Sequence, residues 1–405
     1  MVKIEKIFAT EGLGGFWNDD NEAIKRGAKQ DGFAYIGKPV TPGFKSIRQP
    51  SRAVPVILKM ESGELAFGDC TWVQYGGERA GREKLVPTSE VVSLIHEKLD
   101  PWLLGREIDD FRSVMSQMEE ELELSRAIRF GMSQAILDAV AKTRRMTMAE
   151  VLADEYGTTI EDAPLRLFTQ CGDDFHAAVD KMILRKIPVH PHALINTVAR
   201  LGQLVDYVKW MKTRIKQLLP DEEYDPIFHY DLYGNLGLAY DNDVDKIVEY
   251  LVELEEIANP YRLQIEDPVY MSSKDEQMEV MAQIRRRVKK EGLKLLLVAD
   301  EWVPTMEDKV DFIKAKAADI YQIKPPDLGG VNKSVEAVLH CKSKGVLPYL
   351  GGSCAETARS AQVSVHIALA TRPHQVLAKP GMGVDEGVSI VYNEMQRALA
   401  LIFDK

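Results

Sequence analysis

Short apolar segments alternate with amphipathic helical segments from about residue 164 to the end of the chain. Apolar runs of this kind, bounded by turn residues, are typical of buried parallel strands, and strand–helix repeats build parallel β/α units. The strands are predicted at residues 165–170, 187–191, 227–231, 263–266, 294–300, 319–324, 346–351 and 375–378. Helical patterns between them include 243–257, 306–317, 333–344 and 355–370. Eight such strands predict a TIM-type β/α barrel.

The first part of the chain has a different pattern. Residues 2–9 and 54–60 read as antiparallel strands, and a turn at 61–64 leads into a return strand at 65–73. Helical patterns then follow at 89–99, 109–120 and 125–145. Strands followed by helices indicate an α+β module. The predicted division is an α+β domain at 1–160, a barrel at 161–384 and a C-terminal helix at 385–405 that packs back on the first domain.

The composition of the chain agrees with the predicted fold and excludes some classes of protein. The chain has 405 residues, 45% of them hydrophobic and 28% charged, which is ordinary for a globular enzyme. A doubly wound open sheet is the alternative fold, but no GxGxxG motif follows an early strand. The formal charge of −11 argues against nonspecific nucleic-acid binding. Four scattered cysteines, no apolar leader and no apolar run long enough to span a bilayer predict a cytoplasmic protein away from membranes.

Three acidic residues end three successive predicted strands of the barrel. These residues are Asp231, Glu266 and Asp300, and each is about one strand, one helix and two turns from the next. A single acid at such a place is more often a turn or a helix cap. Three acids at adjacent strand ends would repel one another unless a cation neutralises them. Oxygen ligands without a Cys or multi-His cluster favour Mg²⁺ or Mn²⁺ over Zn²⁺.

A lysine and a histidine are candidate acid–base groups at the same rim. Lys324 ends the next predicted strand, and a like-charged metal nearby would lower its pKa toward that of a useful base. The alternative is a solvent-facing or carboxylate-paired lysine. His190 and His192 are two residues apart, which would place them on one strand face. His192 is the one nearer the catalytic end of the barrel.

Further polar residues could bind an anionic substrate. The glycines of the segment at 351–357 allow backbone N–H groups to approach an anion, and Ser353 adds a hydroxyl, although a plain strand-to-helix turn is the alternative. Cys354 has no partner base that would make it a nucleophile. Gln170 ends the first barrel strand, and Gln322 would share a strand face with Lys324. Gln74, in the α+β domain, could close the mouth of the barrel.

Together these residues resemble the enolase superfamily, which uses Lys or His bases with Mg²⁺. More narrowly, the chain resembles the methylaspartate ammonia-lyase family over nearly its whole length. The motifs that carry this resemblance are PHALIN at 191–196, YQIK at 321–324, GGSC at 351–354, KPGMG at 379–383 and VDEG at 384–387.

The resemblance implies a capping α+β domain on a barrel, a homodimer, Mg²⁺ and an activating monovalent cation such as K⁺. It implies reversible loss of ammonia from threo-3-methylaspartate through an enediolate intermediate to give mesaconate. Metal binding would fall to Asp231, Glu266 and Asp300. Lys324 would be the base for the (2S,3S) substrate and His192 the group on the opposite face. Substrate-binding positions would be Gln74, Gln170, His192, Gln322, Ser353 and Cys354, with Ser353 standing where the family has threonine.

Two other functions fit the same residues. Another enolase-superfamily racemase or dehydratase could use the same site on a different carboxylate substrate, because a fold does not fix a reaction. A barrel that only binds a metal or a ligand is the non-enzymatic alternative. A base such as Lys324 argues against it, since binding alone needs no base.

Overall fold

All eight predicted barrel strands are present, and they close into one parallel barrel. The computed structural model describes residues 2–73, 83–172, 174–220, 223–381 and 383–404. The strand order around the barrel is β10-β11-β12-β13-β14-β15-β8-β9, so β15 pairs with β8 to complete the ring. The bounds are β8 Leu167–Phe168, β9 Val189–Leu194, β10 Ile227–Asp231, β11 Arg262–Glu266, β12 Leu296–Ala299, β13 Ile320–Ile323, β14 Leu347–Leu350 and β15 Gln375–Leu377.

Strand alternation separates the inside of the barrel from its outer layer. Alternate residues point inward, and seven strands each place one apolar side chain in a central cluster. These inward residues are Phe168, Val189, Ile227, Val298, Ile320, Tyr349 and Leu377. Their neighbours Phe228, Ile265 and Tyr321 belong instead to the large core between strands and helices. Two positions further along, the same alternation places a polar residue on the inward face of five of these strands: Gln170, His229, Asp300, Gln322 and Lys379.

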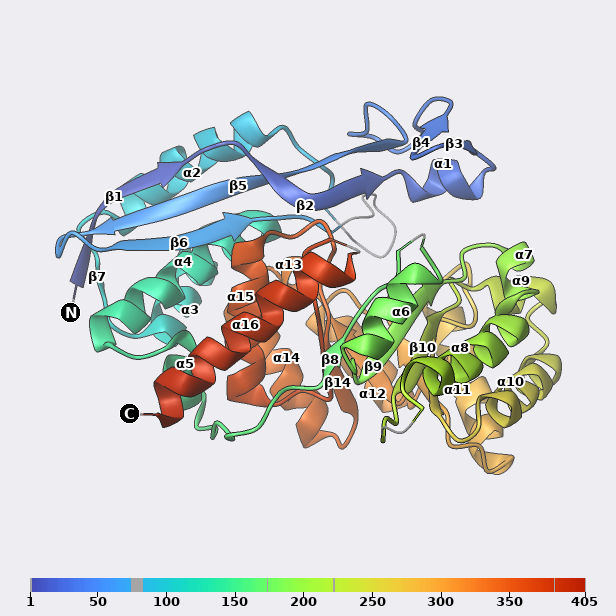
Figure 1. The fold of residues 1–405 in the computed structure, drawn as a ribbon. Coiled ribbons are helices and arrows are strands. Elements are labelled where there is room, and N and C mark those ends of the chain that lie inside the picture. Colours follow the sequence, from blue (N-terminus) through green and yellow to red (C-terminus); the bar gives the residue numbers. More distant parts are fainter. Residues whose placement is uncertain (1, 74–82, 173, 221–222, 382, 405) are drawn as a thin grey trace.

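Helices surround the barrel strands in chain order (Figure 1). They are α6 Ala177–Leu184, α7 Val198–Leu201, α8 Leu204–Leu218, α9 Asn235–Ala239, α10 Val244–Ala258, α11 Lys274–Lys290, α12 Met306–Ala315, α13 Pro325–Leu328, α14 Val331–Ser343, α15 Ala358–Thr371 and α16 Val384–Phe403. We expected residues 385–405 to pack back on the first domain, but the main neighbours of α16 are α15 and α6. Because α16 directly follows β15, the β/α alternation carries it to the outer layer of the barrel.

The N-terminal module is an antiparallel sheet with helices on it. The sheet order is β2-β5-β1-β7, and β6 pairs with β5. The strands are β1 Val2–Ala9, β2 Gly12–Asp19, β5 Arg48–Met60, β6 Leu65–Cys70 and β7 Glu107–Ile108, and a separate hairpin joins β3 Lys29–Asp31 to β4 Ala34–Ile36. The helices are α1 Asn21–Lys25, α2 Thr88–Leu103, α3 Phe111–Glu121, α4 Arg126–Arg144 and α5 Met148–Tyr156. The sheet lies along one side of the molecule, above the barrel in Figure 1.

Strand β2 joins this module to the mouth of the barrel. The Gly15 N–H donates to the Glu356 carbonyl at 2.7 Å, in the loop that follows β14. A side chain at Gly15 would collide with Pro380, and one at Gly14 would collide with the Ala355 carbonyl. The glycines that made this segment unlike a strand in the sequence therefore permit close contact between the two parts of the chain.

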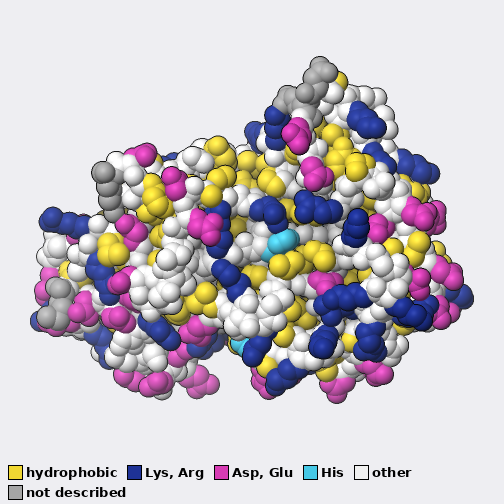
Figure 2. Space-filling model, turned by 90° about the horizontal axis from the view of Figure 1, so that it is seen from below, with side chains coloured by type: hydrophobic (Ala, Val, Ile, Leu, Met, Phe, Trp, Pro, Cys, Tyr) yellow, Lys and Arg dark blue, Asp and Glu magenta, His cyan; other side chains and the backbone are white. Residues whose placement is uncertain are grey.

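Residues of both charges lie where the barrel strands begin. Arg166 and His374 precede β8 and β15, Arg262 is the first residue of β11, and Asp225 and Asp319 lie just before β10 and β13. Burial and the neighbouring Arg166 lower the pKa of His374 to about 4. On the face in Figure 2, acidic and basic side chains are interspersed, and a histidine near the centre lies beside hydrophobic side chains, with basic side chains close by. No described helix is both long and apolar enough to cross a membrane.

Candidate active site

The three predicted acids meet at the C-terminal end of the barrel. Asp231 and Glu266 are the last residues of β10 and β11, and Asp300 directly follows β12. One carboxylate oxygen from each lies within 4.8 Å of the others, and all three side chains are buried. Inward alternation of adjacent parallel strands produces this cluster, because Asp231 pairs with Glu266, and Asp300 lies two residues beyond Val298, the partner of Glu266, and so faces the same way.

Electrostatics make this cluster a suitable place for a divalent cation. Burial and the neighbouring carboxylate of Glu266 hold the pKa of Asp231 well above its usual value. Burial also raises the pKa of Asp300, and Lys324 opposes that shift. Buried like charges at this spacing repel one another, whereas a hard divalent ion would neutralise them and coordinate their oxygens. The donor set therefore fits Mg²⁺ or Mn²⁺.

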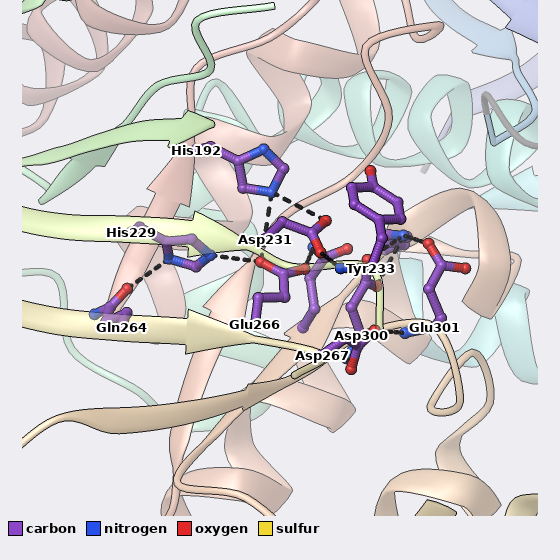
Figure 3. A network of polar contacts seen from close by, with 11 residues as sticks. His192, His229, Asp231, Tyr233, Gln264, Glu266, Asp267, Asp300 and Glu301 are labelled. Carbon is purple, nitrogen blue, oxygen red and sulfur yellow. Dashed lines mark hydrogen bonds and ion pairs between the residues drawn. The ribbon is translucent and has the colours of Figure 1, made fainter. Parts of the chain in front are cut away.

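Glu266 is the most tightly held member of the cluster (Figure 3). Its Oε2 lies 2.5 Å from His229 Nε2, and its Oε1 accepts a hydrogen bond of 3.1 Å from Gln322 Nε2. His229 Nδ1 in turn lies 2.7 Å from Gln264 Oε1. Burial alone would raise the pKa of Glu266, but the contacts with His192 and His229 outweigh it and leave that pKa well below its usual value. Glu266 is therefore an anion before any metal binds.

His192 reaches the cluster through an irregularity in β9. The pairing of β9 with β10 matches Pro191 with His229 and Ala193 with Tyr230, so His192 is an extra residue with φ of 44°. Its Nε2 lies 3.4 Å from Glu266 Oε2 and 3.7 Å from Asp231 Oδ2. Burial lowers the pKa of His192, although contact with Glu266 opposes this shift.

The bulge also corrects one prediction from the sequence. We expected His190 and His192 to share a strand face because they are two residues apart. His190 instead contacts Tyr224 on the outer side, with its Nε2 2.9 Å from the hydroxyl oxygen. The extra residue reverses the alternation between the two histidines, so only His192 faces the carboxylates.

Lys324 lies next to the acids, immediately after β13. Its Nζ is 2.8 Å from both carboxylate oxygens of Asp300 and 3.7 Å from Glu301 Oε1. The Lys324 side chain is buried, so it is not a solvent-facing lysine. Its contact with Asp300 does agree with the alternative of a carboxylate-paired lysine. An amine held against a buried carboxylate at the barrel mouth is also well placed to exchange a proton with a bound substrate.

The predicted substrate-binding residues line the other half of the rim. Gln170 follows β8, and its Oε1 is buried with no hydrogen-bond partner among the residues the structure describes; the same holds for Gln322 Oε1. Ser353 and Cys354 follow β14 and are buried. Burial raises the pKa of the Cys354 thiol, which makes it a poor nucleophile. Gln74 lies outside the described residues.

Two residues of this site, His229 and Asp267, were not predicted from the sequence. His229 lies two residues before Asp231 on β10 and therefore faces the same side of the strand, so its position near the acids could have been predicted. Asp267 follows Glu266 and accepts the backbone N–H groups of Asp300 at 3.3 Å and Glu301 at 3.0 Å. Burial and the charge of Glu266 raise its pKa to about 7. Asp267 thereby ties the end of β11 to the end of β12, and no sequence pattern indicated that role.

Fold and site together define an enolase-type barrel enzyme, with acids on three consecutive strand ends and a lysine on the next. Muconate lactonizing enzyme from Pseudomonas putida has this fold, with a TM-score of 0.61 at 18% identity over 91% of this chain and 84% of that one.

Family models narrow the class further. The methylaspartate ammonia-lyase N-terminus model matches residues 2–157, and the C-terminus model matches residues 159–403. The chain therefore belongs to the methylaspartate ammonia-lyase family, and the prediction of a carbon–nitrogen lyase is confirmed.

Relatives and solved structures agree with this assignment. Methylaspartate ammonia-lyase 2 of Carboxydothermus hydrogenoformans is 48% identical, and the match covers 99% of both chains. The crystal structure of the Clostridium tetanomorphum β-methylaspartase Mg complex has a TM-score of 0.93 at 46% identity, covering 99% of each chain. The Citrobacter amalonaticus methylaspartate ammonia lyase, which contains (2S,3S)-3-methylaspartic acid, has a TM-score of 0.95 at 42% identity, also covering 99% of each chain.

Proposed function

We propose that this protein eliminates ammonia from threo-3-methylaspartate to give mesaconate, in a reversible reaction. The observation that carries the proposal is the position of Lys324, whose Nζ is 2.8 Å from Asp300 at the rim where the three acids converge. Family membership supports the substrate, because the relatives at 42–48% identity are methylaspartate ammonia-lyases.

Asp231, Glu266 and Asp300 would hold Mg²⁺, and Mn²⁺ would fit the same oxygens. A bound divalent cation would neutralise the cluster and stabilise the negative charge that develops on the substrate carboxylate. The Clostridium relative was solved as a Mg complex, which supports this assignment. A monovalent cation such as K⁺ is part of the proposal as an activator.

Lys324 would act as the base on the (2S,3S) substrate. In its neutral form, Nζ takes the proton from C3, and the electrons of the C–H bond move toward the adjacent carboxylate. These electrons then form the C2–C3 double bond while the C2–N bond breaks, so that nitrogen leaves with its electron pair as ammonia. The lysine afterwards returns its proton to solvent. The buried setting of Lys324 and its contact with Asp300 would keep Nζ in one orientation.

The remaining residues would bind and orient the substrate. His192, on the far side of the carboxylates from β13, would serve the opposite face of C3, where the other diastereomer carries its proton. Gln170 and Gln322 each present a buried amide oxygen without a described partner, suited to the substrate ammonium group. Ser353 and Cys354 would bind a substrate carboxylate, and Gln74 is assigned to the same task from the sequence.

Two wider assignments belong to the proposal as well. The protein would act on a small amino-diacid in the cytoplasm as a homodimer. Light scattering coupled to size-exclusion chromatography tests the dimer directly, because a monomer mass of 45.5 kDa would contradict it.

The test is ultraviolet absorbance of threo-3-methylaspartate incubated with the protein, Mg²⁺ and K⁺. We expect a rise from the conjugated product, its loss on addition of a chelator and its return with excess Mg²⁺. Absence of a rise, with metal binding demonstrated separately, would contradict the proposed substrate. Racemisation or dehydration of other carboxylates would then be measured on the same preparation.

A further inference from the structure

Lys379 and Glu356 form an ion pair that is completely buried. Lys379 Nζ lies 2.8 Å from Glu356 Oε1, and both side chains have 0% of their surface exposed. Lys379 opens the KPGMG motif after β15, and Glu356 lies in the loop between β14 and α15. Neither side chain is among the residues assigned above to metal binding, proton transfer or substrate binding.

The pair is bonded to the backbone of the glycine loop at 351–354. Lys379 Nζ donates to the Gly351 carbonyl at 3.0 Å, and the Ser353 N–H donates to Glu356 Oε1 at 2.8 Å. Gly352 crosses the pair with φ of +135°, and a Cβ there would lie 2.2 Å from Lys379 Nζ and 2.3 Å from Glu356 Oε1. Only glycine therefore allows the loop to close over the two charges.

Strand β2 contacts the residues that directly follow this loop, Ala355 and Glu356. The Gly15 N–H donates to the Glu356 carbonyl at 2.7 Å, and neither Gly14 nor Gly15 has room for a side chain. The loop that presents Ser353 and Cys354 is thus bonded to a buried ion pair, and the two residues that follow it contact the N-terminal sheet.

Stability alone is a weak reason for such a pair, because burying two charges costs about as much as their attraction returns. Its bonds to the backbone of Gly351 and Ser353, on either side of Gly352, point to another role. We infer that Lys379 and Glu356 are positioning residues, which hold the loop at 351–354 in the conformation that binds a substrate carboxylate. This inference rests on the proposed function for the identity of the substrate, although the loop conformation can be measured without it.

The first test removes both charges with the double variant Lys379→Met/Glu356→Gln, which leaves no unpaired ion in the interior. We expect KM for 3-methylaspartate to rise by roughly 10- to 100-fold, since small displacements of binding groups have effects of this size. The affinity for Mn²⁺, followed by electron paramagnetic resonance, should remain within about twofold, because the pair bonds none of the three acids. Hydrogen exchange in peptides covering 350–357 should become faster.

A second variant keeps both charges and disturbs only their fit. Gly352→Ala places a methyl group against Lys379 Nζ and Glu356 Oε1, and we expect the same rise in KM and the same faster exchange. Gly37→Ala is the matched control, because Gly37 has φ of +128°, close to that of Gly352, but the added Cβ would meet only Ile47 Cδ1, at an ordinary contact distance of 3.4 Å. It should show wild-type KM and loop exchange despite comparable backbone strain.

The readouts separate this inference from the proposed function. If folded Gly352→Ala and double variants keep wild-type loop exchange and wild-type KM, the positioning role is wrong. A fall in Mn²⁺ affinity equal to the loss of activity would also overturn it, because the effect would then be general. Faster loop exchange in a preparation whose wild type does not convert 3-methylaspartate would support the positioning role and contradict the proposed substrate.

Discussion

Two buried charge clusters lie at the mouth of this barrel, and they are balanced in different ways. Around β14 and β15, one lysine meets one glutamate, and the remaining bonds of both go to backbone groups. Around β10, β11 and β12, Asp231, Glu266, Asp267 and Asp300 crowd together with fewer cations than carboxylates.

The difference separates groups that support structure from groups that await a ligand. The negative charge of Glu356 is already balanced inside the protein by the positive charge of Lys379. At Asp231 and Asp300, burial and neighbouring carboxylates raise the pKa, and a bound cation would stabilise both carboxylates in their ionised form. Excess buried charge therefore identifies the metal site more reliably than the number of acids does. Four changes would break or sharpen this comparison.

Lys324→Ala should have the largest effect, because it removes the proposed base from the unbalanced cluster. We expect turnover of the (2S,3S) substrate to fall by about 10²- to 10⁴-fold, the usual contribution of general acid–base catalysis. Mg²⁺ binding, measured by calorimetry, should persist, since the acids themselves remain. Loss of metal binding instead would show that Lys324 supports the cluster structurally.

His229→Phe should lower metal affinity by about 10- to 100-fold, the usual effect of removing a partner that orients a ligand. Phenylalanine has no nitrogen to replace the 2.5 Å contact of His229 Nε2 with Glu266 Oε2, so the carboxylate is free to rotate. His190→Phe is the matched control, because His190 is equally buried in the preceding strand but contacts Tyr224 instead. Mn²⁺ titration measures the metal affinity of both variants. An equal loss of affinity in the two would mean that His229 acts only through packing.

His192→Ala should change stereochemistry more than rate. With Lys324 intact, we expect the (2S,3S) substrate to keep activity within about tenfold of wild type, while handling of the other diastereomer falls by about 10²-fold or more. Chiral chromatography of partly converted mixtures measures both. An unchanged ratio between the diastereomers would remove His192 from the proton-transfer assignment.

The smallest expected effect concerns pH in the metal-free protein. Burial raises the pKa of Asp267 to about 7, and the pKa values of Asp231 and Asp300 are raised as well. A carboxyl with a higher pKa in the folded state stabilises folding while protonated, and that contribution is lost as pH rises from about 4 through the folded pKa. Without metal, stability from these groups should therefore decline toward pH 8.

Mg²⁺ binds the ionised ligands, so the gain in Tm on adding it should be larger at about pH 8 than at about pH 5, by about 5 °C. Scanning calorimetry with chelator or with excess Mg²⁺ measures both gains. Equal gains at the two pH values would mean that the cluster is already charge-balanced without metal.

Most of the barrel was predictable because each strand is a short apolar run followed by a turn. β10 matches its predicted bounds, and β11 differs by one residue. β2 was not predicted, since its glycines look like a loop, whereas Gly14 and Gly15 are needed for close contact with residues 355, 356 and 380. Local sequence does not contain that contact, because the partners are separated by most of the chain.

The site was predictable where strand ends alone determine position. Asp231, Glu266, Asp300 and Lys324 meet because parallel strands end together. His192 was placed at the correct rim, but the bulge that separates it from His190 depends on register with β10. The Lys379–Glu356 pair was not predicted either, although both residues lie in or beside motifs that indicated the family. Such pairings follow from the closed barrel rather than from spacing within one segment.

Barrel closure also determines when the site can form during synthesis. The ring is complete only when Val376 pairs with Leu167, and the ion pair beneath the glycine loop requires Lys379. When Val376 and Lys379 have not yet been synthesised, all three acids and Lys324 already have been, but the ring cannot close. Such long-range contacts form slowly, since their loop-closure entropy is lost before they stabilise anything. Nearly the whole chain must therefore emerge before the enzyme can assemble its substrate loop.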